Sequence, residues 1–445
     1  MTTTSRTLDV QQFLNAHKLS WAQISTLILC FLIVAVDGFD TASIGFIAPA
    51  IRAEWGLTPK ALAPVFGAGL GGLMAGAFIF GPLADRFGRK TILMVCVAFF
   101  GLASLASAYS TSLEMLIVLR FLTGLGLGGA MPNSVTLSSE YAPERARSML
   151  VMTMFCGFTI GSALGGIAAA HIVATWGWRT VLEIGGILPL ALLPVLAFGL
   201  PESVRYLVMK AHKPEQVRQT LQRIAPQADL RDVTFTVAEQ AHTGFPVKHL
   251  FAPALRAGTL KLWLTFFMCL LVIYLLSSWL PTLIASTGMS LKDASLVTAM
   301  FQVGGTLGAI ALGPLMDRFS PTRVLAVVYS LAAVCTWLIG QSTGNTTMLV
   351  LAVFGAGVTV SGGQVGANAL AAAFYPTASR ATGVSWASGI GRIGSVLGSM
   401  AGGWMMAAGL GMPTLFLIVG IPCLIAGITM FTMAKVGRVQ LVDAH

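Results

Sequence analysis

The sequence contains little charge. Only 10% of its 445 residues are Asp, Glu, Lys or Arg, whereas 56% are hydrophobic. Soluble globular domains usually have about 25% charged residues, so an ordinary soluble domain is excluded. The composition instead indicates a polytopic membrane protein, in which most apolar surface faces lipid and neighbouring helices.

Cysteine and histidine are also scarce, at six residues each. Each cysteine lies alone in a separate apolar segment, without a CxxC pair or a Cys/His cluster, which argues against a disulfide framework and a metal site. There is no HExxH motif, and no His lies deep inside an apolar run. We therefore expect no catalytic residue, no metal and no cofactor.

A net charge of +10 raises the question of a nucleic-acid partner. Most basic residues fall in alternate connections between apolar runs, which is the pattern of cytoplasmic loops in membrane proteins. A nucleic-acid partner is therefore excluded. The polar start of the chain, with Arg6, Asp9 and Lys18, is predicted to be a cytoplasmic tail rather than a cleaved signal peptide.

Apolar runs long enough to cross a bilayer, about 20 residues each, recur along the chain. They are predicted at 22–49, 60–80, 91–110, 113–138, 148–172, 179–199, 260–284, 292–313, 323–341, 346–370, 380–406 and 413–434. This pattern predicts an all-α membrane protein with twelve transmembrane helices, located in the inner membrane with both termini in the cytoplasm. The expected domains are a tail (1–20), a six-helix bundle (21–199), a cytoplasmic linker (200–259), a second six-helix bundle (260–434) and a second tail (435–445).

The two halves of the sequence repeat each other. A shift of 232 residues aligns Gly72 with Gly304 and the tripeptide at 81–83 with that at 313–315, and a shift of 233 aligns 160–165 with 393–398. The two bundles are therefore predicted to be six-helix pseudo-repeats. Secondary transporters built this way bind their substrate near the membrane midplane, where the repeats meet.

Among the charged residues inside the predicted spans, Asp37, Asp40, Arg120 and Arg392 are the candidates for a function in transport. Charge at this depth is costly and usually faces a bundle interior or a water-filled cavity. At about 1.5 Å of rise per residue, Asp37 and Arg120 lie at similar depths and are expected to be able to pair, whereas Arg392 lies about 18 Å along its helix, near the midplane. The equivalent positions in the other half are uncharged, so these charges are specialisations rather than scaffold.

The two aspartates are predicted to couple transport to protons, together with Arg120. Burial favours the protonated form of a carboxyl group and a nearby guanidinium favours the ionised form, so such a pair can take up and release a proton. The alternative is that one aspartate only packs against Arg120. For Arg392 we expect a planar, bidentate contact with a substrate carboxylate, and the alternative is neutralisation of Asp37 or Asp40.

Several motifs resemble a known family. The segment 81–90, GPLADRFGRK, is similar to the loop between helices 2 and 3 of the major facilitator superfamily, and the segment 37–40, DGFD, is similar to the DGxD motif of its aromatic acid/proton symporters. Segments 131–133 and 155–159 resemble those of 4-hydroxybenzoate/protocatechuate carriers. The resemblance implies proton-coupled uptake of an aromatic carboxylate, with 4-hydroxybenzoate or a related hydroxybenzoate as the expected substrate.

Two further sets of residues are predicted from their chemistry and position. The substrate-binding set, chosen for charge, aromatic rings and hydrogen-bonding groups, is Arg392, Asp40, Phe39, Asn133, Phe155, Thr159, Tyr274, Gln302 and Trp386. The cytoplasmic gate, expected to hold the inner side closed, is Asp85, Arg86, Arg89, Lys90, Glu140, Asp317 and Arg318. In the gate, Glu140 is expected to pair with the basic loop. The copy of this loop in the second half contains Asp317 and Arg318 but lacks the glycine and the basic pair of the first copy, so its contacts should be weaker.

Other functions remain open at this point. An exporter or an uncoupled facilitator of the same fold would also contain intramembrane charge, and the substrate could be a non-aromatic acid such as muconate. An intramembrane enzyme would need a catalytic set that the sequence lacks. We expect a monomer whose partners are an aromatic carboxylate, protons and the lipid bilayer.

Overall fold

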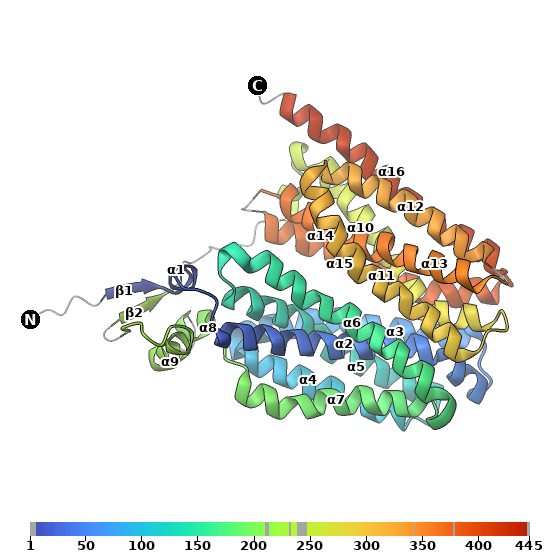
Figure 1. Ribbon diagram of the computed structural model, residues 1–445, viewed down its shortest axis with the longest axis horizontal. Helices are drawn as coiled ribbons and strands as arrows, with labels where there is room; N and C mark the ends of the chain where they lie inside the picture. Colours follow the sequence, from blue (N-terminus) through green and yellow to red (C-terminus); the bar gives the residue numbers. More distant parts are fainter. Residues whose placement is uncertain are drawn as a thin grey trace, which may run out of the picture. The chain divides into compact units, whose positions relative to one another are not determined.

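The computed structural model describes residues 6–209, 213–230, 233–237, 247–342, 344–376 and 379–442, which are almost entirely helical (Figure 1). The helices before the linker are α1 (Val10–Ala16), α2 (Trp21–Trp55), α3 (Pro59–Phe87), α4 (Arg89–Ala108), α5 (Leu113–Tyr141), α6 (Arg147–Trp176) and α7 (Trp178–Gly199). The later ones are α8 (Val204–Met209), α9 (Pro214–Ile224), α10 (Pro253–Ala285), α11 (Leu291–Arg318), α12 (Pro321–Gln341), α13 (Thr346–Ala356), α14 (Gly362–Phe374), α15 (Arg380–Ala407) and α16 (Met412–Val442).

Eleven helical segments within the described residues are long and apolar enough to cross a membrane. One of these spans comprises α13, the short π-helix η3 (Gly357–Ser361) and α14. The twelfth long helix is α15, whose 28 residues include Arg392 and many glycines and serines. Six long spans therefore precede the linker and six follow it, as predicted.

The sequence repeat is also a repeat of helix packing. A Cβ added at Gly72 in α3 would collide with the carbonyl oxygen of Phe121 in α5, and one at Gly304 in α11 would collide with that of Phe354 in α13. These pairs are related by the shifts of 232 and 233 residues seen in the sequence. Glycines at matching positions thus let matching helices approach closely in each half.

The same relation holds for α6 on α2 and α15 on α10. Gly161 faces the carbonyl of Ala35, and Gly394 faces the carbonyl of Phe267.

We expect Gly394→Ala to destabilise the protein by about 1–3 kcal/mol, because the added methyl group overpacks this contact. The measurement is the thermal unfolding midpoint in detergent. Gly389→Ala on the same helix is the matched control, since a Cβ at Gly389 meets nothing within 4 Å, and an equal loss in both variants would contradict this explanation.

The described residues form two compact units. One unit contains residues within 1–41, 71–161 and 182–241, and the other contains residues within 42–70, 162–181 and 242–445. The ends of α2, α3 and α6 farthest from the linker thus pack with the second half of the chain. In this unit the Phe66 ring lies 5.1 Å from the Trp279 ring in edge-to-face geometry, and Gly45 lies against the carbonyl of Ser277.

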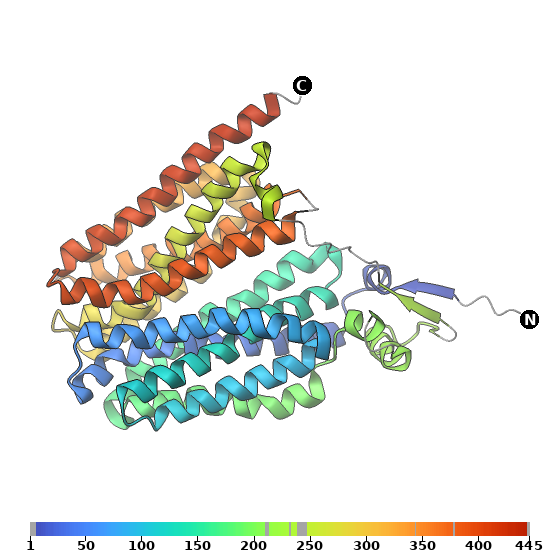
Figure 2. The ribbon, with the colours of Figure 1, turned by 180° about the vertical axis from the view of Figure 1, so that it is seen from behind.

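The tail and the linker fold together into what we call the tail–linker cap, formed by residues 6–17 and 204–237 in the described ranges. Strand β1 (Arg6–Asp9) pairs in parallel with β2 (Val233–Thr236), as Figures 1 and 2 show. The apolar side chains of α1, at helical spacing, are buried in one core with those of α9 and the helix bundle. These side chains are Val10, Phe13, Leu14, Val217, Leu221 and Ile224. Residues 6–17 are therefore folded rather than an extended tail.

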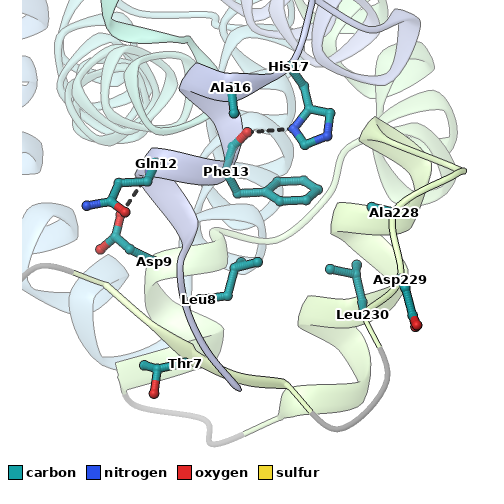
Figure 3. A pocket seen from close by; sticks show the side chains of 10 residues that line it. All are labelled: Thr7, Leu8, Asp9, Gln12, Phe13, Ala16, His17, Ala228, Asp229 and Leu230. Atoms are coloured by element: carbon teal, nitrogen blue, oxygen red, sulfur yellow. Dashed lines mark hydrogen bonds between the residues drawn. The ribbon is translucent and has the colours of Figure 1, made fainter. Parts of the chain in front are cut away.

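The cap is attached to the loop between α5 and α6. Arg145 donates hydrogen bonds to the carbonyls of Asn15 and His17 at 2.9 and 2.8 Å. A cavity of about 410 Å³ lies between α1 and the linker, where Figure 3 shows Phe13 and His17 opposite Leu230. The cap thus packs the tail, which precedes the first half of the chain, against the linker, which precedes the second half.

Two element boundaries differ from the expected domains. Helix α10 begins at Pro253, so the linker ends before residue 259, and α16 continues to Val442, beyond residue 434. Hydropathy identifies the apolar part of a helix, whereas the helical backbone extends further into the polar flanks. The helices are thus longer than the apolar runs that predicted them.

Candidate transport site

An ion pair is buried in the first unit, between α2 and α5. Asp40 is fully buried and Arg120 is 3% exposed. The Arg120 Nη2 atom lies 3.0 Å from Asp40 Oδ2, and Nη1 lies 3.4 Å from Oδ1. The guanidinium therefore faces the carboxylate with both of its terminal nitrogens, the geometry that guanidinium groups use for bidentate recognition.

Two residues from other helices complete the surroundings of Asp40. The hydroxyl of Ser104 in α4 donates a 2.5 Å hydrogen bond to Asp40 Oδ1. Gly185 in α7 lies beside both groups, because a Cβ there would be 3.3 Å from Asp40 Oδ1 and 3.4 Å from Ser104 Oγ. Four helices thus meet at one carboxylate, which accepts three hydrogen bonds.

The expected pairing of Arg120 with Asp37 is corrected by the structure, because Arg120 pairs with Asp40. Asp37 is also buried, at 1% exposure, and accepts a 3.0 Å hydrogen bond from Thr41 Oγ1. The depth count cannot distinguish these aspartates, since residues three apart differ little in height and are separated mainly by direction around the helix. The proton-coupling role of all three charged residues remains a prediction.

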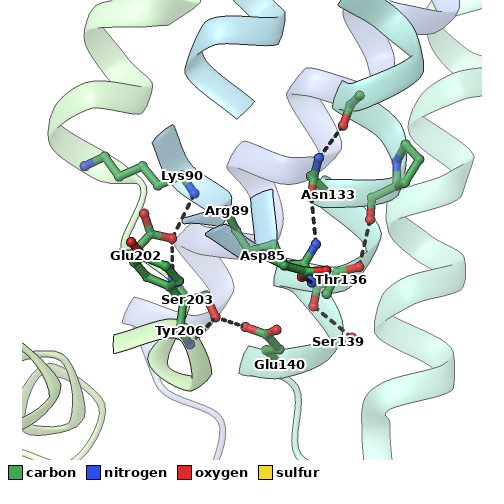
Figure 4. Close-up of polar contacts among 12 residues, drawn as sticks. Asp85, Arg89, Lys90, Asn133, Thr136, Ser139, Glu140, Glu202, Ser203 and Tyr206 are labelled. Atoms are coloured by element: carbon green, nitrogen blue, oxygen red, sulfur yellow. Dashed lines mark hydrogen bonds and ion pairs between the residues drawn. The ribbon is translucent and has the colours of Figure 1, made fainter. Parts of the chain in front are cut away.

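The predicted cytoplasmic gate lies at the linker end of α3, α4 and α5 (Figure 4). Arg89 Nη2 lies 2.6 Å from Asp85 Oδ1, one turn earlier in the chain. Arg89 Nη1 also donates to Asn133 Oδ1 at 2.8 Å, and Asn133 Nδ2 donates to the carbonyl of Gly129. Both polar atoms of the Asn133 amide are therefore engaged at the gate in this structure, although Asn133 was predicted to contact substrate.

The gate is continued by the first residues of the linker, which Figure 4 shows beside α4 and α5. Glu202 Oε1 accepts hydrogen bonds from the backbone N–H groups of Lys90 and Ser203, at 3.0 and 2.8 Å. Glu140 accepts from the Ser203 hydroxyl. The linker is therefore the hydrogen-bond partner of Glu140, and the charge of Arg89 in the basic loop, its expected partner, also acts on this carboxylate.

Gly88 joins α3 to α4 with a positive φ of 99°, and a Cβ there would collide with the Glu202 carboxylate. We expect Gly88→Ala to lower stability by about 2–4 kcal/mol, because it adds backbone strain and displaces a carboxylate that accepts two backbone hydrogen bonds. Thermal unfolding in detergent measures this effect. Gly81→Ala, where a Cβ meets nothing within 4 Å, should be nearly neutral, and a neutral Gly88→Ala would refute the explanation.

The second copy of the gate has fewer contacts. Arg318 lies over the Phe319 ring at 5.6 Å, as Arg86 lies over Phe87 at 5.2 Å. Within the described residues, Asp317 forms no ion pair shorter than 4.0 Å, in contrast to Asp85. This difference agrees with the expectation of weaker contacts in the second half.

The second unit contains the other predicted charge. Arg392 is half-buried on α15, and in the part of the chain that the structure describes it forms no ion pair within 4.0 Å. Gln302 on α11 is 6% exposed, and Tyr274 on α10 is partly buried. Asp40, one of the two aspartates that Arg392 was expected to neutralise in the alternative explanation, pairs with Arg120.

The predicted aromatic residues occupy different environments. Phe39 is buried beside Gly185, whereas Phe155 is 37% exposed on α6. Trp386 is 43% exposed and stacks on Trp263, with ring centroids 5.8 Å apart and an interplanar angle of 18°. On α6, the hydroxyl of Thr159 donates to the carbonyl of Cys156 at 3.1 Å. Their contact with substrate remains a prediction.

Sequence analysis did not identify Ser104, Gly185, Glu202 or Ser203 as site residues. The available signal for Ser104 was weak: hydroxyls at 104, 107 and 110 recur every three residues at the end of a mainly apolar run. Among the residues that the structure describes, no three His, Cys, Asp or Glu side chains form a possible metal site.

Twelve spanning helices in two repeats, with charges buried inside the bundle, define a membrane transport protein of the major facilitator fold. The family model for "Sugar (and other) transporter" matches residues 25–443, and the chain belongs to this family. The sequence-based resemblance to the major facilitator superfamily is thereby confirmed.

Curated relatives extend over most of the chain. It is 52% identical over 406 residues to the 4-hydroxybenzoate transporter PcaK of Pseudomonas aeruginosa, covering 90% of both chains. It is 45% identical to a gallate transporter of Pseudomonas putida, covering 95% of this chain and 94% of the relative. Among solved structures, the crystal structure of a D-xylose–proton symporter gives a TM-score of 0.71 at 19% identity, covering 92% and 97% of the two chains. The chain is a transporter and not an enzyme.

Proposed function

We propose that this protein takes up an aromatic carboxylate, with 4-hydroxybenzoate as the best candidate, together with protons by alternating access. The observation that supports an anionic substrate is the Arg392 guanidinium, which lies in a spanning helix without an ion-pair partner among the described residues. A cation inside the membrane is costly unless an anion or water compensates it. A bound carboxylate would supply that anion and would fit the guanidinium bidentately.

The relatives support the aromatic part of the proposal. Transporters named for 4-hydroxybenzoate are 52%, 50% and 45% identical to this chain, and one named for benzoate is 33% identical. A transporter named for gallate is 45% identical. These four relatives at 45–52% identity are named for hydroxylated benzoates, which favours a compound of this kind as the substrate.

The Asp40–Arg120 pair supports coupling to protons. When Asp40 is ionised, the pair is neutral and has three hydrogen bonds within the bundle. Proton uptake by Asp40 would leave Arg120 as an uncompensated buried charge, which is unfavourable in one conformation and can be relieved in another. Protonation would in this way favour reorientation, with no cofactor and with the proton gradient as the source of energy.

The orientation is part of the same proposal. Basic residues of the gate and the cap lie at the linker end of the helices, and such residues are enriched in cytoplasmic loops. We therefore place both termini and the linker in the cytoplasm, the protein in the inner membrane, and the transport pathway within a single chain that acts as a monomer.

Uptake of radiolabelled 4-hydroxybenzoate into proteoliposomes with an alkaline interior tests the proposal. Unlabelled benzoate, 4-hydroxybenzoate, protocatechuate, gallate, 3-hydroxyphenylpropionate and muconate are added as competitors. Accumulation that collapses with a protonophore, and strongest competition by 4-hydroxylated benzoates, is expected. Flux that ignores the gradient would indicate an uncoupled facilitator, and strongest competition by muconate would overturn the aromatic assignment.

A further inference from the structure

Ser104 has a contact that distinguishes it from Ser107 and Thr123, two buried hydroxyls on the next turn of α4 and on α5. Ser107 on the same helix donates to the carbonyl of Ala103 at 2.8 Å, and Thr123 on α5 donates to that of Leu119 at 2.8 Å. These bonds stay within one helix, as is usual for a helical hydroxyl. Ser104, which is fully buried, instead donates to the Asp40 carboxylate on another helix.

The surroundings of Asp40 contain few other ionisable groups. Arg120 faces it from α5, Asp37 lies three residues earlier on its own helix, and α7 presents the uncharged Gly185, with Glu183 two residues away in sequence. The described donors to the carboxylate are therefore one guanidinium and one hydroxyl.

These two donors respond differently to a proton on Asp40. A guanidinium has only N–H donors, so it cannot accept a hydrogen bond from a protonated carboxyl group. A serine hydroxyl has one donor and two lone pairs. Ser104 can therefore donate to the ionised carboxylate and, after rotation of its hydroxyl, accept from the protonated one.

The two hydrogen bonds differ in strength. A hydrogen bond to an ionised acceptor is about twice as strong as one between neutral groups, so Ser104 stabilises the ionised state of Asp40 more than the protonated state. The Ser104 hydroxyl is fully buried, and removal of one oxygen atom opens less space than a water molecule needs. Loss of the hydroxyl would thus not be compensated.

We propose that Ser104 is a positioning residue for proton coupling, which holds the Asp40 carboxylate and promotes release of its proton. This inference depends on the proposed function, because it assigns a step to the same coupling site. It predicts that Ser104 matters when the proton must leave, during net uptake. It should matter little in exchange, where loaded carriers move in both directions and no net proton release is required.

The test compares Ser104→Ala with the wild type in proteoliposomes, using labelled 4-hydroxybenzoate. Net uptake driven by an alkaline interior should fall about tenfold, the loss of one charge-assisted hydrogen bond, while counterflow exchange stays within about twofold. The pH at which net uptake is half-maximal should rise by about one unit. Ser104→Thr, which keeps the hydroxyl, should restore both the rate of net uptake and its pH of half-maximal activity. Ser107→Ala is the matched control on the same helix and should leave both unchanged.

The outcomes separate the inference from the proposed function. A wild-type protein whose uptake ignores the pH gradient would refute proton coupling itself. A coupled wild type with equal losses of net uptake and exchange in Ser104→Ala, or with no change of its pH profile, would overturn only the role of Ser104. If Ser104→Ala fails to fold, Ser104→Cys, whose thiol is a weaker donor, should show the same separation to a smaller extent.

Discussion

Asp40→Asn is expected to reduce gradient-driven uptake of 4-hydroxybenzoate by about 100-fold or more, because the amide cannot take up and release a proton and leaves the buried Arg120 without its counter-charge. Counterflow exchange should be reduced much less, since it needs no net proton movement. The measurement is the ratio of net uptake to exchange in the same proteoliposome preparation. The effect is large because Asp40 is fully buried and paired with Arg120.

Two further variants distinguish lost coupling from lost folding. Asp40→Asn alone should lower stability by about 3 kcal/mol, the usual cost of breaking a buried pair. Combining it with Arg120→Gln removes both charges and should recover stability but not net uptake. Asp293→Asn, the same chemical change at an exposed position in the first turn of α11, should leave both transport modes unchanged. Full net uptake by Asp40→Asn would exclude this carboxylate as the coupling group.

Arg392→Gln is expected to raise the KM for 4-hydroxybenzoate about 100-fold, the order expected when a charged contact to a carboxylate is lost inside a membrane. Arg392→Lys should give a smaller increase, about tenfold, because a lysine is a point charge that cannot bind a carboxylate bidentately. Initial rates of uptake over a range of substrate concentrations measure both values.

The matched control for Arg392 is Arg380→Gln, which removes an exposed arginine twelve residues earlier on the same helix. Its KM should remain close to that of the wild type. An Arg392→Gln variant with an unchanged KM but a reduced maximal rate would instead assign Arg392 to the conformational change rather than to binding.

The features that sequence analysis predicted well were those governed by local or periodic physics. Apolar runs of sufficient length predicted the spans, and repeated glycines such as Gly72 and Gly304 predicted two halves with equivalent packing, which the structure shows. The cost of burying charge identified Asp40 and Arg120 as unusual, and the structure joins them in an ion pair. Each of these signals is contained in residue type and spacing alone.

The features that were missed depend on direction around a helix or on contacts distant in sequence. Spacing could not decide that Asp40 rather than Asp37 faces Arg120, or that Ser104 donates to that carboxylate. The parallel pairing of β1 with β2 joins residues more than 220 positions apart, and neither short strand has a distinctive pattern. The contact of Gly45 with Ser277 likewise follows from tertiary packing.

The most direct test of the central claim is movement of protons with substrate. Proteoliposomes containing a pH-sensitive dye and no imposed gradient receive external 4-hydroxybenzoate. The account predicts that the lumen of wild-type vesicles becomes acidic on addition of substrate, and that vesicles with Asp40→Asn show no such change although they bind and exchange the same compound. Substrate entry into wild-type vesicles without acidification of the lumen would contradict it.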